Sequence, residues 1–154
     1  MSTVDVTHLH NTKTEHEVIG ACIFDVNIYD YVRDQLHSDI FYDYDCQRAY
    51  EVIQQLDEES KQPDFMEVDM RLKKFNVNVT AFMDFDGTYS AELTKQRIMY
   101  LQDLSIRRRL AALAYKCEVM VSDPTITLDD VQTVIKEYEQ VLIEDRKSGS
   151  AGMP

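Results

Sequence analysis

Apolar side chains recur every three or four residues along most of this 154-residue chain, which is the pattern of helices with one buried face. The first clear group consists of Val18, Ile19, Cys22 and Ile23. Just before this group, Thr14 is followed three residues later by Glu17, which is typical of a capping box at a helix start. The pattern therefore predicts a first helix that begins near Glu15.

Three further short helices are predicted by the same spacing. The first has its apolar residues one turn apart, at Ile28, Val32 and Leu36. The second has an apolar stripe opposite an acidic face, made up of Cys46, Ala49, Tyr50, Ile53 and Leu56. The third has Asp64 and Glu67 at its start, where a side-chain cap is expected, and its stripe consists of Phe65, Val68, Leu72 and Phe75.

Residues 76–92 show no helical spacing. Val77, Val79 and Ala81 alternate as in a short strand, and Asp86-Gly87 is a turn signal. We predict an irregular loop for this segment.

Two longer helices are predicted at the end of the chain. One runs from about Ala91 or Lys95 to Val121, and the other starts at Thr127, an N-cap candidate with Asp130 three residues further on. The second helix has apolar residues at the spacing of a coiled-coil seam, namely Leu128, Val131, Ile135, Tyr138 and Leu142. Because only a few residues separate the two helices, they are expected to form an antiparallel hairpin. The seam spans about two heptads, so it fits packing on the neighbouring helix as well as packing on a second copy.

The fold expected from these elements is all-α, with a globular bundle of short helices followed by a long antiparallel helical hairpin. Residues 1–12 show no periodicity and are expected to form a flexible arm. The globular subdomain is assigned to residues 13–96 and the hairpin to residues 97–146. Residues 147–154 have the composition of a linker.

Composition is that of a globular protein in a reducing compartment. Hydrophobic residues make up 44% of the chain and charged residues 29%. The three cysteines, Cys22, Cys46 and Cys117, form no CxxC pair and lie among apolar residues, so buried free thiols are expected. No apolar run approaches the roughly 18 residues that a membrane span needs. A cytoplasmic protein without a membrane segment is therefore expected.

Negative charge dominates, with a formal net charge of -12. Residues 1–60 carry 3 Lys/Arg against 13 Asp/Glu, so direct binding to the DNA backbone by this part is disfavoured. The consecutive arginines Arg107, Arg108 and Arg109 are the exception. On a helix, three adjacent side chains point in different directions, so one structural ion pair with two solvated neighbours is the favoured interpretation, and contact with a partner is the second.

No catalytic or cofactor-binding motif is present in the sequence. His8 and His10 are two residues apart, and even with His16 they lack a convincing additional metal ligand. Residues 84–92 resemble a calcium loop only in their glycine, since the two essential acidic ligands are missing. The scattered glycines form no phosphate-binding loop. We therefore expect no catalytic residue, no cofactor and no metal in this chain.

Several motifs nevertheless resemble a known family. Residues 15–25, EHEVIGACIFD, resemble the E-x-E-x-x-(I/L)-G-x-(I/L)-(L/F)-x opening of the N-terminal domain of DnaB-type replicative DNA helicases. Leu36 and residues 39–42, DIFY, resemble the L-x-x-x-D-F-Y segment of that family. Residues 48–56, RAYEVIQQL, resemble the helix that follows it.

The resemblance continues to the end of the chain. Residues 63–72 are similar to the family's P-(I/V)-D-x-x-(T)-V-x-x-x-L element, with Phe65 displaced relative to it. Residues 105–110, SIRRRL, resemble an S-x-x-R-x-L stretch on the first hairpin helix, which places Arg108 on the recurrent arginine. Residues 152–154, GMP, resemble the G-(I/V)-P that precedes the helicase domain. Residues 76–92 depart from the family pattern.

This resemblance implies a non-catalytic N-terminal domain of a hexameric replicative DNA helicase in a bacterial or phage replisome. It implies subunit pairing through the hairpin and docking of primase, and possibly of the helicase loader. ATP and Mg²⁺ are then expected only for the helicase domain, which is missing from this chain and toward which residues 147–154 would lead. The candidate interface residues are Ile98, Leu101, Arg108, Leu128, Val131, Ile135, Tyr138 and Leu142.

Two alternatives stay open at this point. A free-standing acidic helical adaptor without a motor domain fits the same composition and the same hairpin. An enzyme with an unrecognised carboxylate site is less favoured, because acidic residues at helical spacing usually form a solvated face.

Overall fold

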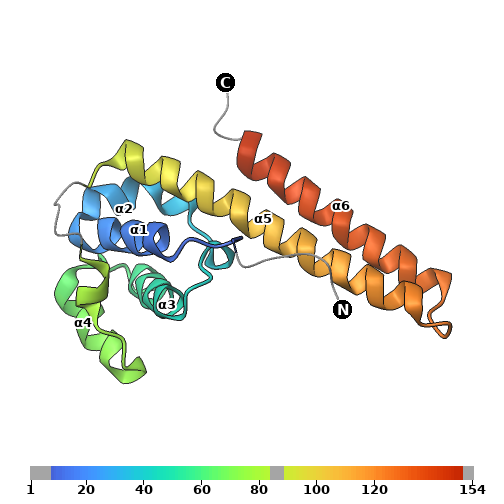
Figure 1. Ribbon diagram of the computed structural model, residues 1–154. Helices are drawn as coiled ribbons and strands as arrows, with labels where there is room; N and C mark the ends of the chain where they lie inside the picture. The colour runs from blue at the N-terminus through green and yellow to red at the C-terminus, as the bar shows by residue number, and fades with distance from the viewer. Residues whose placement is uncertain (1–7, 84–88, 151–154) are drawn as a thin grey trace. The chain divides into compact units, whose positions relative to one another are not determined.

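The computed structural model describes residues 8–83 and 89–150, with side chains in the last helix described up to Ile143. Within these ranges the chain contains helices and no strand, which confirms the all-α prediction. The α-helices are α1 (Thr12–Phe24), α2 (Val26–Val32), α3 (Tyr44–Glu58), α4 (Phe65–Leu72), α5 (Ala91–Ser122) and α6 (Leu128–Ser150) (Figure 1). Four 3₁₀ helices accompany them: η1 (Arg33–Gln35), η2 (Ser38–Ile40), η3 (Lys73–Phe75) and η4 (Val79–Phe82).

The chain forms two compact units. One comprises residues 10–102, and the other comprises residues 103–154 together with residues 1–9. The division falls inside α5, six residues beyond the boundary expected at residues 96 and 97. The reason is that the first part of α5 supplies Ile98 and Leu101 to the globular core, where both are fully buried.

The globular unit is built around α1. Its side chains Val18, Ile19, Cys22 and Ile23 are buried, as the apolar spacing predicts. α3 faces the same core with Cys46, Ala49, Val52, Ile53 and Leu56, and α4 adds Val68 and Leu72. Burial of apolar area at about 25 cal/mol per Å² supplies the main stabilisation of such a bundle.

The start of α1 differs from the prediction. The helix begins at Thr12, and Asn11 is its N-cap, with its side-chain oxygen accepting a hydrogen bond from the Thr14 backbone N–H at 3.0 Å. Glu17 instead pairs with Arg97 at 2.7 Å, so the predicted capping box is wrong. Sequence spacing could not separate these two caps, because both residue pairs have suitable side chains.

Glu15 ties α1 to the turn that precedes α3. Its side chain is fully buried, and Oε1 accepts hydrogen bonds from the backbone N–H groups of Tyr42 at 2.8 Å and of Asp43 at 2.9 Å. Asp43 in turn caps α3, accepting a hydrogen bond from the Cys46 N–H at 3.2 Å. The negative charge of the Asp43 carboxylate is favoured here, because the N-terminus of α3 carries a partial positive charge.

The segment expected to be an irregular loop is partly helical. Val79–Phe82 forms η4, with the Asn78 side chain accepting a hydrogen bond from the Thr80 N–H at 3.0 Å. Val77 and Val79 are buried, but Ala81 is exposed and Phe82 is buried instead, so the strand-like alternation of the sequence ends where η4 begins to turn. Asp86 and Gly87, the predicted turn, lie outside the described residues.

Both ends of the chain also depart from expectation. Residues 1–7 of the predicted arm lie outside the described residues, but Leu9 is buried and α1 begins at Thr12, so the chain is held in place earlier than expected. At the other end α6 continues to Ser150, so residues 147–150 are helical where a linker was expected.

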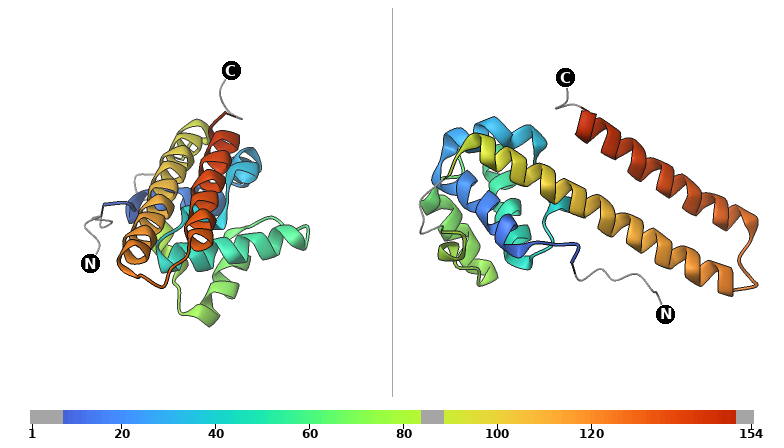
Figure 2. Two further views of the ribbon diagram at one scale, coloured as in Figure 1. Left: turned by 90° about the vertical axis from the view of Figure 1, so that its right-hand side faces the viewer. Right: turned by 45° about the horizontal axis from the view of Figure 1, so that its top comes forward.

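The second unit contains the predicted hairpin. α6 runs antiparallel alongside the C-terminal part of α5, as Figure 1 shows and the two further views of Figure 2 confirm. Thr127 and Asp130 form the predicted cap at the start of α6. The Thr127 N–H donates to Asp130 Oδ2 at 3.0 Å, and the Asp130 N–H donates to Thr127 Oγ1 at 3.3 Å. These hydrogen bonds hold the pKa of Asp130 below its ordinary value, so the cap persists at neutral pH and is lost as the pH falls through that lowered pKa.

Gly20 gives a direct test of the packing between α1 and η4. A Cβ atom at this position would lie 2.2 Å from the carbonyl oxygen of Phe82 and 2.8 Å from the hydroxyl of Tyr89. Gly20→Ala should therefore lower the free energy of unfolding by about 1–3 kcal/mol through steric overlap, although alanine is the better helix former. Urea denaturation measures the change. Gln55→Ala on the exposed side of α3 is the control and should be neutral within about 0.5 kcal/mol. A Gly20→Ala chain as stable as the unsubstituted one would contradict this packing.

Candidate functional site

The hairpin has an apolar inner face that holds its two helices together. Leu113 of α5 and Val134 and Val141 of α6 are its buried residues. The half-buried residues packed against them are Ile106, Leu110, Cys117, Met120 and Tyr138. An ion pair between Lys116 and Glu137 at 3.0 Å also joins the two helices. Because both of its side chains are about half exposed, it contributes little compared with the apolar contact.

Tyr138 belongs to this inner face. Partial burial, together with the neighbouring Cys117, raises the pKa of Tyr138 above its ordinary value. Its place among the candidate interface residues is therefore corrected, because its ring packs against α5 of the same chain, which is one of the two packings that the seam spacing allowed.

The other four residues of the predicted seam lie on an exposed face of α6. The exposed fractions are 81% for Leu128, 40% for Val131, 50% for Ile135 and 47% for Leu142. Four large apolar side chains at a coiled-coil spacing are thus left uncovered by the hairpin itself. These four residues form the exposed row of α6, and exposed apolar surface of this kind typically marks a contact with another protein.

The row borders an apolar cavity near the loop between the two helices. The cavity measures about 210 Å³. Its lining residues are Cys117, Met120, Val121, Ile126, Val131, Val134, Ile135 and Tyr138. Val131 and Ile135 belong both to this lining and to the exposed row, so a side chain that covered the row could also reach the cavity.

Arg108 has a structural contact within the second unit. Its Nη1 atom donates a hydrogen bond to the carbonyl oxygen of Leu9 at 2.6 Å, across 99 residues of sequence. Arg107 forms an exposed ion pair with Asp103 at 2.8 Å, one turn earlier on α5. The interpretation of Arg108 as a structural residue agrees with this geometry, although the partner is a backbone carbonyl where an ion pair was expected.

Ile98 and Leu101 were predicted as interface residues, and this prediction is wrong because both side chains are buried. Their exposed fractions are 0% and 1%, and both side chains lie in the core of the globular unit. A partner could contact them only after that core had opened. Their apolar spacing along α5 continues that of the hairpin, so the sequence alone could not distinguish residues of the globular core from residues of an interface.

No curated protein matches the chain in a direct comparison of sequences. The model of the DnaB-like helicase N terminal domain family, in contrast, matches residues 7–98. Among solved structures, the chain is similar to the crystal structure of the N-terminal domain of DnaB helicase from Mycobacterium tuberculosis, with a TM-score of 0.70 and 15% sequence identity. The match covers 83% of this chain and 96% of the other.

An all-helical bundle followed by a helical hairpin is the architecture that these comparisons support. The chain belongs to the family of DnaB-like helicase N-terminal domains, because the family model covers more than half of its length. The structural similarity extends the agreement in fold beyond residue 98, since it spans 83% of the chain. Among the described helices, none has a segment both long and apolar enough to cross a membrane.

Arg108 provides a test of how the second unit is held together. Arg108→Ala should lower the free energy of unfolding by about 1.5–3 kcal/mol, because a hydrogen bond to a charged donor is lost and the Leu9 carbonyl loses a partner. Chemical denaturation of the purified chain measures this difference. Arg107→Ala is the matched control and should change stability by less than about 0.5 kcal/mol, because its ion pair is exposed. Equal losses of stability in the two variants would show that the hydrogen bond from Arg108 to the Leu9 carbonyl contributes no more than the exposed ion pair of Arg107.

Proposed function

We propose that this chain serves as the non-catalytic N-terminal domain of a hexameric replicative DNA helicase. In this role it pairs neighbouring subunits through its hairpin and offers a docking surface to primase or the helicase loader. The exposed apolar row of α6, formed by Leu128, Val131, Ile135 and Leu142, is the observation that carries the proposal. Membership of the DnaB-like family supports the assignment to a replicative helicase.

A second copy of the chain is the partner that best suits this row. Every copy carries the same apolar face, so two hairpins related by a twofold axis can cover each other with identical residues. The spacing of three, four and seven residues is that of a helix packing in a coiled coil. Leucine, valine and isoleucine on both sides would then lose their contact with water, at about 25 cal/mol per Å² of apolar area.

Pairing through the row predicts a dimer that charge substitutions disrupt. Sedimentation equilibrium at high micromolar concentration should show the unsubstituted chain as a dimer. Ile135→Asp or Leu142→Asp should weaken association at least about a hundredfold, because a carboxylate would be buried without a partner. Met70→Asp, an equally drastic change at a 63% exposed residue of α4, is the control and should leave the dimer intact.

Two results would contradict this pairing. One is an unsubstituted chain that stays monomeric at high micromolar concentration. The other is a dimer that persists in both hairpin variants while circular dichroism shows that they are folded.

The docking part of the proposal concerns α4 of the globular unit. Met66 and Met70 are 70% and 63% exposed and lie one turn apart, so they present a single flexible apolar patch. Methionine side chains adapt readily to different partner surfaces. Acidic side chains flank this patch at Asp64, Glu67 and Asp69. A partner with apolar residues surrounded by basic ones would suit both features.

Primase and loader binding can be tested separately from pairing. We expect the double variant Met66→Asp, Met70→Asp to bind primase or loader at least about tenfold more weakly in fluorescence titrations, since hot spots of interfaces contribute about 2 kcal/mol or more. The same variant should remain dimeric. Ile135→Asp is the reciprocal control, which should lose the dimer and keep its affinity for a monomeric partner. Unchanged binding by the α4 variant would place docking elsewhere or exclude it.

A further inference from the structure

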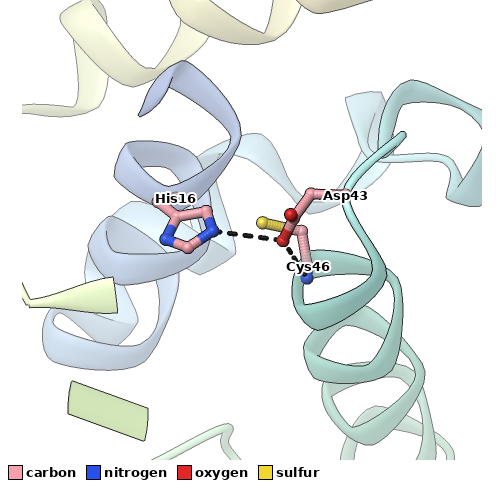
Figure 3. Close-up of side chains that lie close together, drawn as sticks. All are labelled: His16, Asp43 and Cys46. Atoms are coloured by element: carbon pink, nitrogen blue, oxygen red, sulfur yellow. Dashed lines mark hydrogen bonds and ion pairs between the residues drawn. The ribbon is translucent and has the colours of Figure 1, made fainter. Parts of the chain in front are cut away.

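Three side chains from separate parts of the sequence meet at the junction of α1 and α3. His16 lies in the first half of α1, Asp43 caps α3, and Cys46 lies in the first turn of α3 (Figure 3). One nitrogen, one carboxylate oxygen and the sulfur of these residues all lie within 4.8 Å of one another. Figure 3 shows the three side chains pointing toward a common point.

The two ring nitrogens of His16 both face oxygen atoms that accept hydrogen bonds. Nδ1 lies 2.9 Å from the carbonyl oxygen of Ala81, which only accepts, so this nitrogen carries a proton. Nε2 then lies 3.1 Å from Asp43 Oδ2, a second acceptor. In a neutral ring Nε2 would present a lone pair to a carboxylate, and the two would repel each other. A second ring proton resolves this conflict, and so does a metal ion.

We propose that His16 Nε2, the Asp43 carboxylate and Cys46 Sγ form a binding site for a divalent transition-metal ion of the zinc class, with water as the fourth ligand. Imidazole, carboxylate and thiolate are the three ligand types that Zn²⁺ accepts in proteins. The mixture of nitrogen, oxygen and sulfur excludes Mg²⁺ and Ca²⁺ as preferred ions, since these favour all-oxygen sites.

The surroundings orient the ligands before any ion arrives. Metal-binding histidines usually donate the proton of their other nitrogen to a backbone carbonyl or a carboxylate, which is how His16 uses Ala81. Asp43 accepts from the Cys46 N–H at 3.2 Å, and its own backbone N–H donates to Glu15 at 2.9 Å. These contacts fix the positions of both α3 ligands relative to α1.

Charge balance also favours a cation at this point. The carboxylates of Asp43 and Glu15 lie close together here, since Glu15 Oε1 accepts the hydrogen bond of the Asp43 backbone N–H at 2.9 Å. On binding Zn²⁺ the Cys46 thiol would give up its proton to solvent, so that a thiolate and the Asp43 carboxylate together neutralise the two positive charges of the ion.

The site is also open to solvent. The side chains of His16 and Asp43 are 23% and 24% exposed, so an ion can enter and a water molecule can complete the coordination, while Cys46 closes the inner side. Sequence spacing concealed the arrangement, because Asp43 lies 27 residues beyond His16. His8 and His10, which the sequence analysis set aside as metal ligands, are not part of it. Bound metal would fasten α1 to α3 in addition to the Glu15 hydrogen bonds.

Cobalt titration of the full chain tests this site, since Co²⁺ replaces Zn²⁺ and reports sulfur coordination through a thiolate-to-metal charge-transfer band. We expect the band in the unsubstituted chain and its removal by stoichiometric Zn²⁺. His16→Gln and Cys46→Ser should each weaken binding by more than the roughly 10–100-fold cost of losing an outer-shell partner. The matched controls, Cys117→Ser and the double variant His8→Gln, His10→Gln, should keep both band and affinity.

Variants of the other two cysteines identify the sulfur ligand even when Cys46→Ser does not fold. In that case a charge-transfer band that persists in both Cys22→Ala and Cys117→Ser assigns the sulfur to Cys46, the third of three cysteines. Absence of a sulfur band in the unsubstituted chain overturns the proposal and leaves a proton as the bridging cation. Loss of binding in the His8/His10 variant overturns it in favour of a site at the N-terminal histidines.

Discussion

The buried carboxylate of Glu15 is the contact on which the geometry of the globular unit depends. A fully buried charge is costly unless it is hydrogen-bonded, and here one oxygen accepts the two backbone N–H groups that lead into α3. This pairing sets the position of α3 relative to α1. It consequently places Asp43, the cap of α3, where it meets His16. These hydrogen bonds connect α1 to the start of α3, and other buried polar groups add to them, such as the Tyr50 hydroxyl, which donates to the Leu36 carbonyl oxygen at 3.0 Å.

The hairpin divides its apolar residues between two tasks. Val134, Tyr138 and Val141 hold α6 against α5, whereas Leu128, Val131, Ile135 and Leu142 remain exposed. A helix that needed only to complete its own hairpin would gain solubility from polar side chains at these four positions. The proposed pairing with a second copy would cover these four side chains and so account for their apolar character. A free-standing acidic adaptor would share the globular charge but gives no comparable reason for the row.

Negative charge is concentrated in the first part of the chain. Residues 1–60 carry 13 acidic residues against 3 basic ones, which disfavours contact with a polyanion such as DNA. The arginines of α5 offset this only in part, because Arg97 is ion-paired with Glu17 and Arg107 with Asp103. This distribution of charge is consistent with the proposed contacts to other proteins and disfavours contacts to DNA.

The sequence alone determined the helical class, most helix positions, the cap formed by Thr127 and Asp130, and the family, because these depend on local spacing and short motifs. It could not show which part of the structure covers the apolar face of each helix. Tyr138 turned inward and Ile98 and Leu101 entered the globular core, since helical periodicity marks an apolar side without saying what covers it. The grouping of His16 with Asp43 and Cys46 was equally hidden. Only the tertiary structure decided these points, because they depend on contacts between residues far apart in the chain.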